Sequence, residues 1–125
     1  MLVYLDLCCL KRPFDDQRQA RIALESTAVL AILQAVADGR VNAVRSLAHE
    51  LENDRNPDLR RARTVSMWLN TRNPVEATPP SVAERTRRLA ESGLGAMDAY
   101  HLAWAEYLEA DVLVKAVVRQ QQLSR

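Results

Sequence analysis

Residues 1–10 form an almost unbroken apolar run that contains a single carboxylate, Asp6. A strand with one solvated face would carry a polar residue at every second position, and this run does not. The pattern therefore predicts a strand covered on both faces, as in a parallel sheet flanked by helices. Asp6 falls near the end of that strand, where open α/β sheets bind ligands, so it is a candidate site residue. The alternative is that Asp6 only caps the turn that follows.

The composition fits one globular domain that spans residues 1–125. Of these residues 48% are apolar and 26% are charged. The net charge of +1 gives no bulk electrostatic attraction to nucleic acid. The N-terminal apolar run is too short for a secretion signal, and no stretch looks long enough to span a membrane. Cys8 and Cys9 are adjacent and lack metal-finger spacing. We therefore expect a cytoplasmic protein that does not cross a membrane.

Helical and strand patterns alternate along the rest of the chain. Helices are expected over residues 17–37, 47–53, 57–69, 81–92 and 97–110, and further strands over 41–44, 75–78 and 111–114. Ser46 is expected to cap the second of these helices. Ser81 and Glu84 are spaced as a capping box, and Gly93 follows as a C-terminal stop. The alternation predicts an α/β fold with a short parallel sheet flanked by helices.

Three carboxylates fall where this topology can bring them together. Asp6 ends the first strand, Glu50 lies near the start of the helix after the second strand, and Asp98 opens the last helix. Helices that follow parallel strands begin at the carboxyl edge of the sheet, so all three could face one crevice. Taken singly, Glu50 could be a solvated helix charge like its neighbour Glu52. Asp98 could merely stabilise the helix dipole.

A cluster of carboxylates points to a divalent cation. Like charges at close range favour protonation of one partner, and a bound cation removes that penalty. Oxygen-only ligands select Mg²⁺ or Mn²⁺ over zinc. Such an ion lowers the pKa of bound water and neutralises charge on a phosphate oxygen. The chemistry implied is phosphodiester hydrolysis by a metal-activated water.

Two segments resemble a bacterial branch of the PIN-domain family. Residues 4–17 carry Tyr-Leu-Asp, Cys-Cys-Leu and Arg-Pro-Phe-Asp-Asp-Gln, and residues 98–103 read Asp-Ala-x-His-Leu-Ala. The middle stretch 49–57 also fits. The resemblance implies a PIN-like three-layer α/β sandwich and a metal-dependent ribonuclease that acts on RNA, with Asp6, Glu50 and Asp98 at the metal site. Many relatives are VapC-like toxins of type II toxin–antitoxin pairs, which are usually homodimers inhibited by a small antitoxin.

The sequence departs from the family pattern at two places. The residue after the first acid is usually Thr or Ser, and here it is Leu7. Relatives usually follow the last strand with a fourth acid, whereas residues 115–118 read Lys-Ala-Val-Val, so the tail from about residue 115 has diverged. The alternative to a nuclease is therefore a catalytically impaired PIN domain that binds RNA or protein.

Two further polar residues lie close to these motifs. Arg12 follows the strand that ends in Asp6, so it could reach a substrate phosphate. His101 lies one helical turn after Asp98. The resemblance favours a packing and hydrogen-bonding role for His101 over a role as base or metal ligand.

Overall fold

The computed structural model describes residues 1–70 and 77–115, in which strands and helices alternate. The strands are β1 (Leu2–Leu5), β2 (Asn42–Ala43) and β3 (Val112–Val114). The helical elements are α1 (Leu7–Lys11), the 3-10 turn η1 (Arg12–Phe14), α2 (Ala20–Ala37), α3 (Leu47–Asp54), α4 (Leu59–Leu69), α5 (Pro80–Glu91) and α6 (Ala96–Tyr107). The expected α/β class is confirmed.

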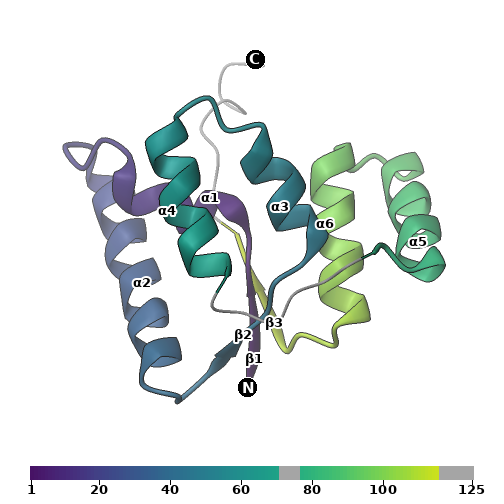
Figure 1. The fold of residues 1–125 in the computed structure, drawn as a ribbon, viewed down its shortest axis with the longest axis horizontal. Helices are drawn as coiled ribbons and strands as arrows, with labels where there is room; N and C mark the ends of the chain where they lie inside the picture. The colour runs from purple at the N-terminus through teal and green to yellow at the C-terminus, as the bar shows by residue number, and fades with distance from the viewer. Residues whose placement is uncertain (71–76, 116–125) are drawn as a thin grey trace.

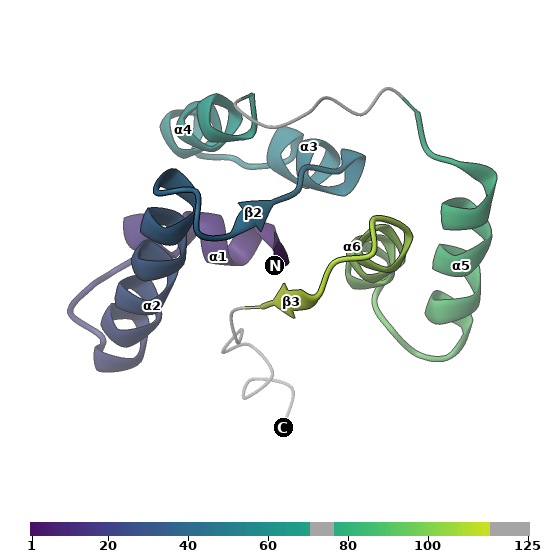
Figure 2. The same ribbon diagram turned by 90° about the horizontal axis from the view of Figure 1, so that it is seen from below.

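The three strands form a parallel sheet with β1 in the centre. Their order is β2-β1-β3, with Val3 opposite both Ala43 and Val112. At the start of the β1–β3 pair, the Leu2 N–H donates to the Asp111 carboxylate, and the Asp111 N–H donates to the Leu2 carbonyl. Figures 1 and 2 show α2 and α4 on one side of the strands and α5 and α6 on the other. The sheet is therefore covered on both faces, as an apolar central strand requires.

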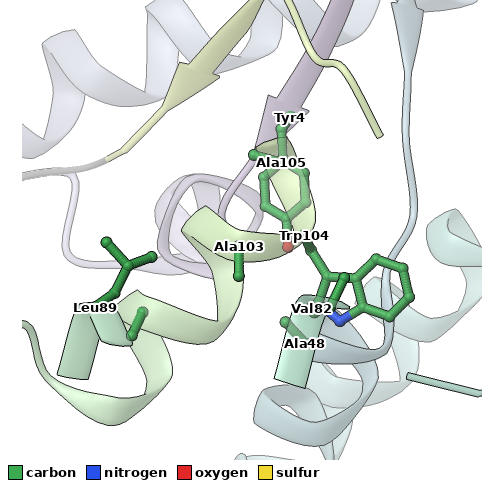
Figure 3. Close-up of a cluster of buried hydrophobic side chains, with 8 residues drawn as sticks. Tyr4, Ala48, Val82, Leu89, Ala103, Trp104 and Ala105 are labelled. Carbon is green, nitrogen blue, oxygen red and sulfur yellow. The ribbon is translucent and has the colours of Figure 1, made fainter. Parts of the chain in front are cut away.

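Successive residues of β1 point into two different cores, because side chains alternate along a strand. Tyr4 packs with residues of α3, α5 and α6, around the fully buried Trp104. Figure 3 shows the Tyr4 ring extending from β1 towards α6. Leu5 packs in a second core, with Val29 of α2 and Val65 of α4. This division explains why the strand reads as a continuous apolar run.

The apolar run at residues 1–10 is not one strand, and the prediction is wrong beyond Leu5. The chain turns at Asp6, whose Oδ1 atom accepts the Cys9 N–H at 3.0 Å and so caps α1. In helix α1 the side chains of Leu7, Cys9 and Leu10 are buried. A short apolar run is consistent with a buried helix as well as with a buried strand, so its periodicity could not distinguish the two structures.

Other boundaries agree with the expected ones to within a few residues, with one difference in capping. The Ser81–Glu84 capping box is wrong, because α5 begins at Pro80 and Pro79 is its N-cap. Glu84 instead pairs with Arg87 and Arg88. Gly93 has φ of +115°, as expected for the C-terminal stop of α5.

Parts of two expectations lie outside the described residues. The expected strand over 75–78 falls partly there, and its described residues Ala77 and Thr78 are not in a strand. The diverged tail after Lys115 also lies outside.

The sequence analysis expected no stretch long enough to span a membrane, but helix α2 is long enough. Within the described ranges it is the one helix that could do so by length and composition, with a mean hydropathy of 1.5 over 18 residues. Yet the Ser26 hydroxyl donates to the Arg12 carbonyl, and Glu25 pairs with Arg12 at 3.3 Å. Helix α2 thus makes polar contacts with η1 while Leu24 and Leu30 are exposed.

Candidate active site at the carboxyl edge of the sheet

Asp6 lies at the carboxyl end of the central strand, where it is 5% exposed. Its backbone N–H donates to the Val114 carbonyl at 3.1 Å, which ties it to the end of β3. Burial raises the pKa of the Asp6 carboxyl, while its hydrogen bonds with Cys9 and the charges of His101 and Lys115 lower it. The Cys9 N–H donates to Oδ1 of Asp6, which confirms the capping role. This hydrogen bond does not by itself prevent the carboxylate from having a second role.

Asp98 lies in the first turn of α6, as expected. Its side chain is 56% exposed, and the Lys115 ammonium lies 3.1 Å from its Oδ1 atom. The same ammonium lowers the pKa of Asp6. Lys115 thus supplies a positive charge to two of the three expected acids.

Glu50 is not brought to the other two acids by any contact within the described ranges. It forms an ion pair with Arg45, which also donates to the Leu69 carbonyl at 3.4 Å. Both side chains line a cavity of about 250 Å³ between α3 and α4, together with Asn53 and Ser66. Glu50 therefore points from α3 towards α4.

Glu52 occupies the opposite side of α3, since residues two apart on a helix do not share a face. Its Oε1 atom lies 2.9 Å from His101 Nε2 of α6, and its side chain is 27% exposed. The pKa of the Cys8 thiol is raised to about 11, mainly by burial and to a smaller extent by the charges of Asp6 and Glu52. The sequence analysis interpreted Glu52 only as a solvated helix charge and did not predict its contact with His101. The signal that could have found it is its spacing of four from the buried Ala48, which packs in the core with α6.

A buried polar network lies beneath this edge. The Tyr4 hydroxyl is 2.6 Å from His101 Nδ1 and 2.7 Å from Ser46 Oγ. His49 Nε2 is 2.6 Å from the Leu5 carbonyl, and its Nδ1 accepts the Ser46 N–H at 3.1 Å. Burial lowers the pKa of His49 to about 4 and strongly raises that of Tyr4. The expected hydrogen-bonding role of His101 is confirmed.

Arg12 lies in a cleft of about 500 Å³ that also contains Cys8 and Lys11. Its side chain is largely buried and pairs with Asp15 at 3.0 Å and with Glu25. These two carboxylates hold the guanidinium in the wall of the cleft. Contact with a phosphate would therefore compete with existing ion pairs.

The carboxylates have the chemistry for a hard cation but do not form a finished site. Within residues 1–70 and 77–115, no three His, Cys, Asp or Glu side chains are close enough together to hold a metal ion. Asp6, Glu52 and Asp98 are related only indirectly: Lys115 contacts Asp98 and lowers the pKa of Asp6, and the charges of Asp6 and Glu52 both raise the pKa of Cys8. Carboxylate oxygens suit Mg²⁺ or Mn²⁺. An ion there would have to displace the ammonium.

Comparisons with known proteins do not assign this chain to a family. No family model, curated protein or solved structure matches it. The functional argument therefore rests on the residues of the site.

Proposed function

We propose that this chain is a metal-dependent endoribonuclease with a PIN-like three-layer fold. The observation that carries the proposal is the convergence of segments bearing Asp6, Glu52 and Asp98 at the carboxyl edge of a parallel sheet. Lys115 links two of these acids electrostatically, and the charges of Asp6 and Glu52 both act on Cys8. This edge is the usual ligand site of such sheets.

In this proposal Glu52 takes the position that the sequence assigned to Glu50. Asp6, Glu52 and Asp98 would hold Mg²⁺ or Mn²⁺ only after Lys115 leaves Asp98 and the three carboxylates move closer together. Such an ion, when bound, makes water a nucleophile near neutral pH and stabilises charge on a phosphate oxygen. The Cys9 N–H fixes one oxygen of Asp6. In the nearby cleft the RNA backbone would meet the charge of Lys11, whereas Arg12 would first have to leave its ion pairs with Asp15 and Glu25.

The test is cleavage of a mixed RNA pool by the purified protein in Mn²⁺, in Mg²⁺ and in EDTA. Cutting in either metal and none in EDTA is expected. Asp6→Asn and Asp98→Asn should abolish it. Cutting that persists in either variant refutes the proposal and indicates a contaminating nuclease.

A matched pair of substitutions on one helix separates the two glutamates. Glu52→Gln should abolish cutting, because it removes a carboxylate from the sheet edge. Glu50→Gln should retain cutting, because it alters only the contact with Arg45 between α3 and α4. Thermal melts of both variants show that each is folded. The reverse result would return Glu50 to the site.

The contact between Lys115 and Asp98 favours a second candidate function. An ammonium at the acidic edge opposes a cation, and Leu7 supplies no hydroxyl to support one. A catalytically impaired PIN domain would then bind RNA or a protein without cutting. RNA binding that is unaffected by EDTA, with no cleavage in any metal, would support this candidate over the nuclease.

We propose further that the nuclease is a cytoplasmic toxin that forms a homodimer and is inhibited by a small antitoxin. Exposed leucines on α2 support the homodimer: Leu24 and Leu30 are 72% and 52% exposed, and homodimer interfaces are more apolar than the rest of a protein surface. Light scattering on the purified protein measures the oligomeric state. A monomer at tens of micromolar would contradict the dimer.

A further inference from the structure

Two helices carry clusters of arginines, and the charges of the two clusters are compensated to different degrees. On α5, Arg85 pairs with Glu106 of α6, and Arg87 and Arg88 both pair with Glu84. Arg88 also lies in the last turn of its helix, where the helix dipole favours a cation. Contacts within the fold therefore account for the arginines of α5.

The arginines of α4 are not accounted for in this way. Arg60 and Arg63 are exposed, and neither forms an ion pair with any described residue. Arg61, between them, pairs with Asp58 at 3.2 Å and with Asp15 at 2.8 Å. Arg60 lies in the first turn of α4, where the helix dipole disfavours positive charge. The charges of Arg60 and Arg63 thus gain no partner within the fold, which favours a negatively charged partner outside it.

Unpaired cations gather around the turn between α3 and α4. Among the described residues, the Lys and Arg side chains outside any ion pair are Lys11, Arg55, Arg60 and Arg63. Arg55 is the C-cap of α3, and the spacing of three places Arg60 and Arg63 on one face of α4. Asp54, beside Arg55, brings one unpaired negative charge to this turn. Positive charge is therefore in excess here.

A cleft connects this turn with the acidic edge of the sheet. Lys11 lines the cleft of about 500 Å³, together with Asn56 and Asp58 of the turn. Cys8 lines the same cleft, and the charges of Asp6 and Glu52 act on its thiol. A chain of negative charges that lies on α4 and follows the cleft past Lys11 therefore approaches the carboxylates of the proposed active site.

We propose that Lys11, Arg55, Arg60 and Arg63 form a track that binds the phosphate backbone of RNA. The inference rests on the proposed function for the identity of the polyanion, but it requires neither a bound metal nor cleavage. Three of the four side chains are arginines, whose planar guanidinium can donate two hydrogen bonds to one phosphate. Contacts of this kind position an RNA chain without reading its sequence.

The test measures binding of a fluorescein-labelled single-stranded RNA of mixed sequence by anisotropy, in EDTA and at a series of KCl concentrations. Each phosphate contact to a single strand contributes about 0.7 to the fall of log K with log salt concentration. Changing Arg60→Gln and Arg63→Gln together should make this slope shallower by about 1.4, and weaken binding roughly 25-fold at about 0.1 M salt. Lys11→Gln and Arg55→Gln should each make it shallower by about 0.7.

The double substitution Arg87→Gln and Arg88→Gln is the matched control. It removes the same charge from exposed side chains of a neighbouring helix, where Glu84 already pairs with both. This variant should keep the wild-type slope. Thermal melts should show that the Arg60 and Arg63 variant is folded, because those two side chains form no ion pair within the described residues. Equal changes of slope in the two variants would reveal a bulk charge effect and overturn the proposal.

The outcomes distinguish this inference from the nuclease proposal. RNA binding that depends on Arg60 and Arg63, with no cleavage in any metal, would support the track and refute the nuclease. Cleavage by a protein whose RNA binding is unchanged in the Arg60 and Arg63 variant would overturn the track and leave the nuclease. If both proposals hold, this variant should raise KM with little change in kcat, because the track does not touch the reacting atoms. A wild-type protein that binds no RNA in EDTA at low salt would also overturn the track.

Discussion

His49 makes the stability of the fold depend on pH in a calculable way. It is fully buried, and both ring nitrogens are committed: Nε2 donates to the Leu5 carbonyl and Nδ1 accepts the Ser46 N–H. A proton on Nδ1 would face another donor. Desolvation by burial is the largest cause that lowers the pKa of His49 from 6.5 to about 4. Folding therefore requires the neutral ring.

The sign follows from proton linkage. Below pH 6.5 the unfolded chain binds a proton at residue 49 that the folded chain does not bind, so the free energy of unfolding falls as the pH falls. Each unit by which the pH falls between 6.5 and 4 lowers the free energy of unfolding by roughly 1.4 kcal/mol. The loss at pH 5 is therefore about 2 kcal/mol, a sizeable part of the roughly 5–15 kcal/mol of a typical domain.

The assay is urea unfolding between pH 5 and 7.5 on the wild-type protein and on His49→Gln. The Gln amide can still donate towards Leu5 but does not titrate. Asp6 gives an opposite slope, because its raised pKa makes the folded chain bind a proton first, and this slope is present in both proteins. The difference between the two curves should therefore change by about 2 kcal/mol from pH 7 to pH 5. A constant difference would refute the argument.

Three further outcomes are expected. Lys115→Met should tighten Mn²⁺ binding several-fold in calorimetry, because it removes an ammonium 3.1 Å from Asp98; unchanged affinity would separate Lys115 from the site. Leu5→Ala should cost about 3 kcal/mol in urea unfolding, whereas Leu24→Ala, at a side chain 72% exposed, should cost under about 0.5 kcal/mol. Equal costs would contradict the assigned cores. Cys8 should react with a disulfide reagent at pH 8 on the order of 100-fold more slowly than in the urea-unfolded chain, because its pKa is about 11; equal rates would contradict the raised pKa.

The sequence was informative where a physical signal is unique and failed where two structures satisfy one pattern. An apolar run with little alternation requires cover on both faces, and that predicted the parallel sheet correctly. The same run could not reveal that the strand stops at Leu5, because Leu7–Lys11 is equally apolar as a buried helix. The capping box predicted from the spacing of Ser81 and Glu84 was wrong, because α5 begins earlier, with Pro79 as its N-cap and Pro80 as its first residue.

The candidate site shows the same division. Asp6 and Asp98 were placed correctly at strand and helix ends, since topology alone fixes such positions. The choice between Glu50 and Glu52 depends on the rotation of α3, which is set by how Ala48 and His49 pack. Two glutamates on opposite sides of one helix cannot be ranked by composition. Glu50 contacts Arg45, which lies just before α3, whereas Glu52 contacts His101 of α6.

The position of β1 in the sheet has a consequence for biosynthesis. Strand β1 is synthesised before β2 and β3, yet its partner β3 lies about 110 residues later, and Leu2 bonds to Asp111 across a separation of 109 residues. At translation rates of about 5–20 residues per second, one edge of β1 stays unpaired for on the order of ten seconds. During that time Leu2–Leu5 is an apolar strand open to pairing with other chains. The nascent protein is therefore most exposed to aggregation before Val112–Val114 has been made.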